Sequence, residues 1–120
     1  MNLDRNSALN LWRDVLANSV RGDGPDLSAR QMAILMAVYL TPPPHTVRGL
    51  AKSLDLGKPA VTRALDTLAS YGLLKRRRDP DDLRNVLVQR TVRGSVFLTE
   101  FGDSIVEAAH TEASQERSAA

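Results

Sequence analysis

The chain has 120 residues, of which 42% are hydrophobic, and this composition suffices for a single domain with one modest core. It contains no cysteine, which excludes disulfides and thiolate metal sites and is typical of a reducing compartment. No stretch approaches the ~18 apolar residues that span a bilayer, and the N-terminus lacks a basic segment followed by an apolar run. We therefore expect a cytoplasmic protein without a membrane segment.

The basic residues are concentrated between Thr46 and Arg93. This segment carries eleven Lys and Arg against five Asp, a net charge of +6, whereas the remainder carries five basic against nine acidic residues, a net −4. Because a Lys or Arg that neutralises a phosphate releases a condensed counterion, such a segment favours binding to a polyanion. An ordinary solvated charged face is the alternative, and the acidic flanks would also suit a protein partner.

Two helices are predicted in the N-terminal third. Apolar residues recur on one face of a helix over about residues 3–19, namely Leu9, Trp12, Val15 and Leu16. Gly22–Asp26 forms a loop, after which Ser28 and Gln31 can make a capping box that begins a second helix. This helix is apolar nearly all round, so we expect it at the centre of the domain. Pro42–Pro44 ends it and forms a stiff connector.

A helix-turn-helix is predicted between Thr46 and Gly72. Thr46 is expected to cap the first of its helices, which Gly57 closes. Pro59 suits the first turn of the second helix, whose buried stripe is Val61, Ala64, Leu65 and Leu68. Two short helices joined by a tight glycine-containing turn form this motif, and the second of them enters the DNA major groove.

The segments Leu73–Arg78 and Asn85–Arg90 are β-prone and flank the turn Asp79–Arg84, so they predict an antiparallel hairpin, the wing. After Thr91 a C-terminal helix over about residues 92–115 is predicted, fading into a polar tail from Glu112 to Ala120. The expected fold is therefore mainly α with a small β-hairpin. It is a single domain over 1–120, with a winged helix-turn-helix core over 28–93 and flanking terminal helices.

The candidate DNA contacts on the second helix of the motif are the residues that its buried stripe leaves free, namely Lys58, Pro59, Ala60, Thr62 and Arg63, with Asp66 at the edge of this face. Arg63 is the expected base contact, because a guanidinium can bridge the two acceptors of guanine. Thr62 is expected to meet either a phosphate or a thymine methyl. On the preceding helix, we expect contacts that hold the phosphate backbone without reading sequence, from Thr46, Arg48 and Lys52.

The wing offers a second kind of contact. Arg84 is expected in the minor groove, where narrow A·T-rich segments concentrate negative potential. Asp82 can orient this guanidinium through a charge-assisted hydrogen bond, and a solvent-exposed ion pair of little energetic worth is the alternative. Residues 76–78 are all arginine and alternate between the faces of a strand, so only part of the run, with Arg76 and Arg78 as candidates, can face DNA.

Taken together, these segments resemble the winged helix-turn-helix regulators of the MarR type, from about Ser28 to Phe101. The resemblance is carried by three stretches: Thr46–Ala51, Val61–Leu68 followed by Gly72–Leu74, and Asp79–Arg84 leading into Thr91. It implies a bacterial, nucleoid-associated regulator of transcription, expected to be a repressor, that binds pseudo-palindromic double-stranded DNA as a homodimer. It also implies a dimer interface of terminal helices, often beside a pocket for small phenolic or lipophilic effectors. The candidate dimer residues are Leu9, Trp12, Leu16, Phe97, Phe101 and Ile105.

The chain departs from the family pattern at two places. Family members usually end in two helices, whereas the residues after Thr91 suffice for one, which bears on the geometry of the dimer. The family also often carries an arginine directly before the wing arginine, where this chain has Leu83. Leu83 either weakens the wing contact or serves packing.

No convergent set of acid, base and nucleophile is recognisable, so we expect no enzyme, no catalytic residue and no cofactor. His45 and His110 lie far apart and have no ligand-like spacing around them, which indicates surface or capping roles rather than a metal site. The competing function is a winged helix that docks another protein through the same basic face, as an antirepressor or adaptor. The fold alone does not distinguish the two.

Overall fold

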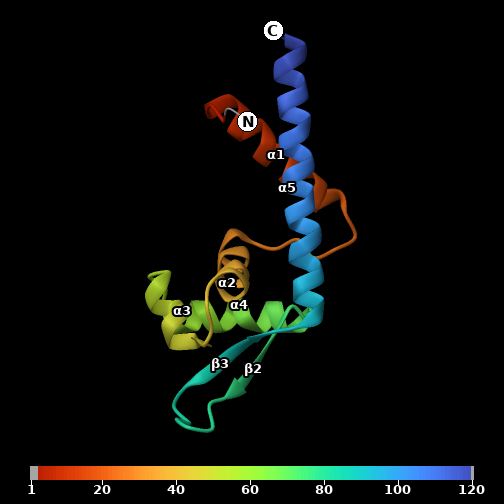
Figure 1. Ribbon diagram of the computed structural model, residues 1–120. Coiled ribbons are helices and arrows are strands. Elements are labelled where there is room, and N and C mark those ends of the chain that lie inside the picture. Colours follow the sequence, from red (N-terminus) through yellow and green to blue (C-terminus); the bar gives the residue numbers. More distant parts are fainter. Residues whose placement is uncertain (1–2, 120) are drawn as a thin grey trace. The chain divides into compact units, whose positions relative to one another are not determined.

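The computed structural model describes the backbone of residues 3–119 and the side chains of residues 3–115, arranged in two compact units (Figure 1). We call Leu27–Leu98 the winged-helix unit. The terminal unit takes the chain up to Asp26 and again from Thr99 onward. That both units form a single domain over 1–120 stays a prediction.

Three helices build most of the winged-helix unit: α2 (Ala29–Leu40), α3 (Val47–Ser53) and α4 (Lys58–Ser70). The predicted capping box begins α2, because the Ser28 hydroxyl accepts from the Gln31 amide at 3.1 Å while the Gln31 side chain accepts from the Ser28 amide at 2.9 Å. The predicted N-cap of α3 is also confirmed, since the Thr46 hydroxyl accepts from the Gly49 amide at 2.9 Å.

The predicted end of α3 at Gly57 was wrong. The helix ends at Ser53, and Asp55 takes a left-handed conformation with φ 52°. The Leu56 amide then donates to the Ala51 carbonyl at 2.9 Å, which satisfies a carbonyl of the last turn in the manner of a Schellman motif. Aspartate tolerates this conformation better than most residues, so no glycine is needed here. Gly57 instead caps the N-terminus of α4.

A three-stranded antiparallel sheet completes the winged-helix unit, in the order β1 (His45–Thr46), β3 (Val86–Arg90) and β2 (Leu74–Arg78). The predicted hairpin is confirmed, with Leu74 opposite Arg90 and Arg78 opposite Val86. Strand β1 was not predicted. It has two residues, too few for an alternating pattern, and it exists because the connector after α2 brings it beside the middle of β3.

One hydrophobic core lies between the helices and the sheet. The predicted stripe of α4 is fully or nearly fully buried, and so is the inward side of α2, which supports the central position expected for that helix. The mainly α winged helix-turn-helix with a small β-hairpin is thus confirmed. The buried core residues are Ile34, Leu35, Val38, Val47, Leu50, Ala51, Val61, Ala64, Leu65, Leu68, Leu73, Leu74 and Val88.

The Tyr39 hydroxyl joins α2 to the strands and to the start of α5 (Val92–Ala119). It lies 2.6 Å from the Leu73 carbonyl oxygen and 3.1 Å from that of Thr91, and it accepts from the Thr91 amide at 2.8 Å. The Thr91 hydroxyl donates to the Gly72 carbonyl at 2.7 Å and accepts from the Gly94 amide at 3.0 Å, so it caps α5. We call these contacts the Tyr39 junction.

In the terminal unit, α1 (Arg5–Arg21) is capped at its N-terminus by Asp4, whose carboxylate accepts from the Ser7 amide at 2.8 Å. The Trp12 and Phe101 rings pack in a T-shaped arrangement, with centroids 6.3 Å apart. Helix α5 continues to Ala119, so the fading predicted from Glu112 was wrong, because Glu, Gln, Arg and Ala are good helix formers. The end of that predicted tail, Ala120, lies outside the described residues. No described helix is long and apolar enough to cross a membrane.

The Tyr39 junction leaves no room for a side chain at position 94. A Cβ there would lie 1.8 Å from the Tyr39 hydroxyl oxygen and 2.1 Å from the Leu73 carbonyl oxygen. We expect Gly94→Ala to lower the free energy of unfolding by roughly 1–3 kcal/mol, because the helix or the strand exit must shift. Urea unfolding followed by circular dichroism measures this change.

The matched control is Gly102→Ala in the same helix, where a Cβ would meet nothing within 4 Å. It should raise stability by up to about 1 kcal/mol through helix propensity. Equal effects of the two substitutions would contradict the close contact at Gly94.

Candidate nucleic-acid interface

A basic hollow of about 190 Å³ lies between α3, α4 and the wing. Its lining includes four cationic side chains and no acidic one. Five predicted DNA contacts come together here from three separate segments of the chain, namely Arg48, Lys58, Thr62, Arg76 and Arg84. Cations gathered around a concave surface make a site suited to a phosphate group, and here two of them, Arg76 and Arg84, also bind aspartates that lie outside the lining.

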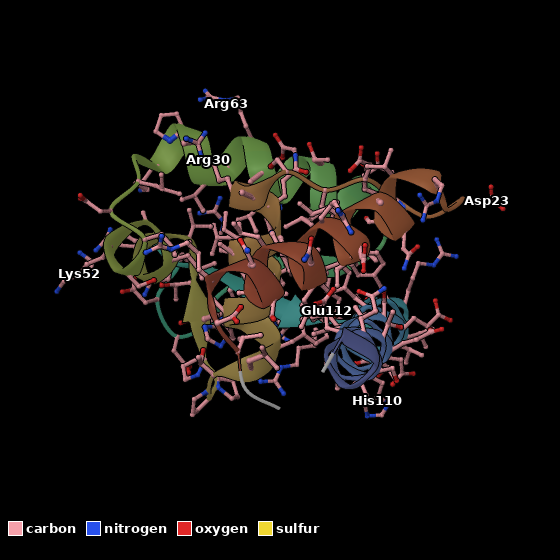
Figure 2. The ribbon with its side chains drawn as sticks, turned by 90° about the horizontal axis from the view of Figure 1, so that it is seen from above. Asp23, Arg30, Lys52, Arg63, His110 and Glu112 are labelled. Atoms are coloured by element: carbon pink, nitrogen blue, oxygen red, sulfur yellow. The ribbon has the colours of Figure 1, made fainter. Side chains whose placement is uncertain are left out.

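The remaining predicted contacts surround the hollow or lie beyond it. Arg63 and Lys52 are exposed, and Figure 2 shows both pointing outward, from α4 and α3 respectively. Pro59 is exposed in the first turn of α4, and Ala60 beside it is half-buried. Thr46 is half-buried, and its hydroxyl is already engaged in capping α3.

An ion pair joins α4 to the wing. The Arg76 guanidinium donates to the Asp66 carboxylate at 2.7 Å, and the side chains remain 29% and 60% exposed. A pair with this much solvent contact contributes little to stability, so its effect is to orient Arg76 at the edge of the hollow. The sequence placed Asp66 on the exposed face of α4, but no spacing rule identifies a partner ten residues away on a strand.

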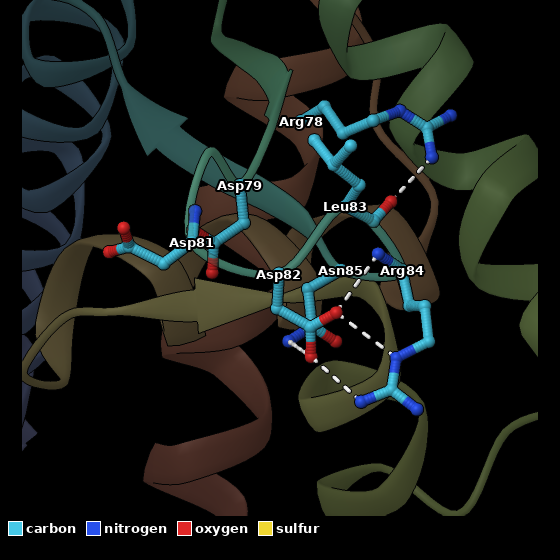
Figure 3. Close-up of polar contacts among 7 residues, drawn as sticks. All are labelled: Arg78, Asp79, Asp81, Asp82, Leu83, Arg84 and Asn85. Atoms are coloured by element: carbon cyan, nitrogen blue, oxygen red, sulfur yellow. Dashed lines mark hydrogen bonds and ion pairs between the residues drawn. The ribbon is translucent and has the colours of Figure 1, made fainter.

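The turn of the wing is closed by its own polar groups. The Asp79 amide donates to the Asn85 carbonyl at 3.0 Å, and the Asn85 amide donates to the Asp82 carbonyl at 2.9 Å. The Arg78 guanidinium crosses the turn and donates to the Leu83 carbonyl at 2.6 Å (Figure 3). Arg78, predicted as a DNA contact, thus also holds the shape of the turn.

The contact between Asp82 and Arg84 that the sequence indicated is present, and it is also exposed to solvent, with 37% and 81% of the two side chains accessible, so it orients Arg84 and contributes little to stability. One carboxylate oxygen accepts from Nε and from the backbone amide of Arg84, and the other accepts from Nη2, all at 3.1 Å (Figure 3). These contacts hold the pKa of Asp82 below its ordinary value, chiefly through the Arg84 side chain, then its amide, with a smaller contribution from Arg48. The same pairing raises the pKa of Arg84.

His45 lies next to the end of α2. Its Nε2 is 3.1 Å from the Thr41 carbonyl oxygen, which fits the capping role that the sequence indicated. Among the described residues, no group of three or more His, Cys, Asp or Glu side chains is placed to hold a metal ion.

Comparison with known proteins assigns the family. The model of the MarR family matches residues 27–86, which is half of the 120 residues. The chain belongs to the MarR family. No curated protein matches this MarR-family chain by sequence.

Solved structures share the fold of this MarR-family chain. A mutant of MepR from S. aureus matches with TM-score 0.76 and 22% identity, covering 92% of this chain and 79% of that one. A MepR–DNA complex from S. aureus matches with TM-score 0.70 and 21% identity, covering 93% and 86%. A mutant MarR from E. coli complexed with operator DNA matches with TM-score 0.69 and 25% identity, covering 92% and 76%.

The candidate dimer residues of this MarR-family chain occupy different surroundings. Leu9, Trp12 and Leu16 are exposed on α1 and, with Val20, form one apolar stripe. Phe101 and Ile105 are half-buried in the terminal unit, and Phe101 contacts Trp12. Phe97 packs against the core of the winged-helix unit. The α1 stripe is therefore the part of this set that is most available to another molecule.

The geometry of the wing gives a titration test. We expect the Asp82 carboxyl to titrate below 3.8 in the intact chain and to move toward 3.8 in Arg84→Ala, because the main stabiliser of the carboxylate is removed. A lowered pKa means that the contact stabilises the wing at pH above the unfolded value and is lost only as pH falls through the folded value. NMR titration of the carboxyl carbon measures both values.

The control for this titration is Arg77→Ala, which removes an exposed arginine of the same wing. It should leave the pKa of Asp82 lowered. An Asp82 pKa that does not respond to Arg84→Ala would show that the pairing in Figure 3 is absent in solution.

Proposed function

We propose that this MarR-family chain binds specific sequences of double-stranded DNA and regulates transcription. We expect it to act as a repressor and to have no enzymatic activity. The observation that carries the proposal is the basic hollow between α3, α4 and the wing. The DNA complexes of MepR and of MarR among proteins of the same fold support it. A regulator of this kind acts in the cytoplasm, on the nucleoid.

The hollow is proposed to hold one phosphate of the DNA backbone. Arg48, Lys58 and Arg76 would neutralise its charge, and the positive end of the α4 dipole adds to the attraction. Thr46 and Lys52 on and beside α3 are proposed to contact neighbouring phosphates, which set the register of the protein on the duplex without reading bases.

We assign recognition of the DNA base sequence to the exposed start of α4 and to the wing. With a phosphate in the hollow beside Thr62, the side chains of Pro59, Ala60 and Arg63 would face the major groove, where Arg63 can bridge the O6 and N7 acceptors of guanine. Arg84 is proposed to enter the minor groove, with Asp82 and Arg78 holding the turn that presents it.

A second copy of the chain is proposed to cover the apolar stripe of α1. Leu9, Trp12, Leu16 and Val20 lie at helical spacing and stay exposed, which is costly for side chains of this size unless a partner buries them. A symmetric pair of winged-helix units would then bind the two halves of a palindromic site.

The competing function is a winged helix that binds a protein through its basic face. Phosphate contacts predict a steep fall of affinity with salt, because each one releases a counterion on binding. A mobility shift of genomic fragments at two salt concentrations therefore separates the two functions. Absent or salt-insensitive binding would favour the adaptor.

The division of roles between α3 and α4 is tested by two substitutions. Arg63→Ala is expected to weaken binding to the cognate duplex by ~1–3 kcal/mol and to relax preference at one base pair. Lys52→Ala should weaken binding to cognate and random duplexes alike and reduce the salt slope by about one. Competitive mobility shifts with both duplexes measure these effects. If the two variants lose the same affinity on both duplexes, the division of roles is wrong.

The dimer proposal is tested on α1. Leu9→Asp and Leu16→Asp place a charge in the stripe and should shift the chain from dimer to monomer, because burying an unpaired carboxylate is unfavourable. Sedimentation equilibrium measures the shift. Asn18→Asp adds the same charge at an exposed position of α1 and should leave the dimer intact. A dimer that tolerates both leucine substitutions would place its interface elsewhere.

A further inference from the structure

The tip of the wing carries an exposed leucine. Among residues 74–90, all of which the structure describes, Leu83 is the one large hydrophobic side chain that remains exposed, at 63%. It precedes Arg84 and follows Asp82, the pair that faces the minor groove in the proposed function. The alternative that Leu83 serves packing does not hold, since most of its surface meets solvent.

Two hydrogen bonds hold the backbone next to this leucine. Its carbonyl accepts from the Arg78 guanidinium at 2.6 Å, and the next amide, that of Arg84, donates to the Asp82 carboxylate at 3.1 Å. Figure 3 shows the Leu83 side chain beside Arg78, while Arg84 turns toward Asp82. Leu83 is thus presented at a defined place, and little conformational entropy of the main chain is lost when it meets a surface.

A leucine side chain gains most from apolar atoms. Phosphates offer it none, whereas the walls of the minor groove are lined by deoxyribose carbons and its floor by the edges of the base pairs. Proteins that enter this groove often insert an apolar side chain at a base step, which unstacks the step in part. Arg84, one residue away, supplies the electrostatic attraction that draws the tip into the groove.

We propose that Leu83 is an apolar wedge that enters the minor groove beside Arg84 and opens the base step that it meets. This inference rests on the proposed function and adds a determinant of specificity to it. Pyrimidine–purine steps unstack with least cost, so the wing favours TA or CA steps at the position of Leu83 without a hydrogen bond to their bases.

The test uses the tightest duplex selected from a random-sequence library by the full-length chain. 2-Aminopurine replaces each adenine of its flanks in turn, since the fluorescence of this base rises when it is unstacked. We expect the intact chain to raise the fluorescence at one step in each flank. Leu83→Ala should abolish most of that rise and weaken binding by roughly tenfold, because the buried apolar contact is lost. Leu83→Met, which keeps an apolar side chain of similar size, should restore both.

The matched control is Leu40→Ala, which removes the same side chain from another exposed leucine. Leu40 lies at the end of α2, where Arg90 donates to the Thr41 carbonyl at 3.0 Å, at the opposite end of the hairpin from the turn. This variant should bind with unchanged affinity and fluorescence. Unchanged urea midpoints show that both alanine variants are folded.

Three outcomes would overturn the wedge. If the intact chain binds no duplex, the proposed function fails together with the wedge. If the intact chain binds with no rise in fluorescence at any flank position, DNA binding stands and the wedge is wrong. The same conclusion follows if Leu83→Ala matches the intact chain in affinity and in 2-aminopurine fluorescence. If Leu83→Ala behaves as the intact chain does, the exposed leucine would have to serve another contact, such as one with a protein.

Discussion

The hydroxyl of Tyr39 connects the wing to the helical part of the winged-helix unit. A single side-chain oxygen joins the exit from α4, at Leu73, to the end of the hairpin, at Thr91. Arg90 reinforces the same place, because its guanidinium donates to the Val38 carbonyl at 2.9 Å and lies over the Tyr39 ring. The base of the wing and the end of α2 are thereby held together, and α4 and the wing keep a defined separation.

A defined separation matters because the basic hollow brings like charges together. Arg48, Lys58, Arg76 and Arg84 line one concavity, and their mutual repulsion opposes its formation. Two aspartates at its margin, Asp66 and Asp82, each hold one of these arginines without entering the lining. Each pair orients its arginine and offsets part of its charge, so Arg48 and Lys58 carry most of the charge that a phosphate in the hollow would meet.

Sequence reasoning located the elements well and their side-chain partners poorly. The apolar stripe of α4 and the cap of α2 depend on near neighbours in the chain, so spacing revealed them. The Asp82–Arg84 pair was visible for the same reason. Strand β1, the junction at Tyr39 and the pairing of Asp66 with Arg76 depend on residues far apart in sequence, and a two-residue strand or a single tyrosine carries no periodic signal. The five predicted DNA contacts that line the hollow come from segments far apart in sequence, so their proximity could not be predicted either.

The ion pair between Asp66 and Arg76 couples α4 to the wing, so a change of sequence in one element affects the position of a side chain in the other. A chimera that receives a foreign α4 without an acidic residue at position 66 would leave Arg76 without this ion pair and alter the lining of the hollow. Exchange of α4 together with β2 would keep this contact and the position of Arg76 in the lining of the hollow.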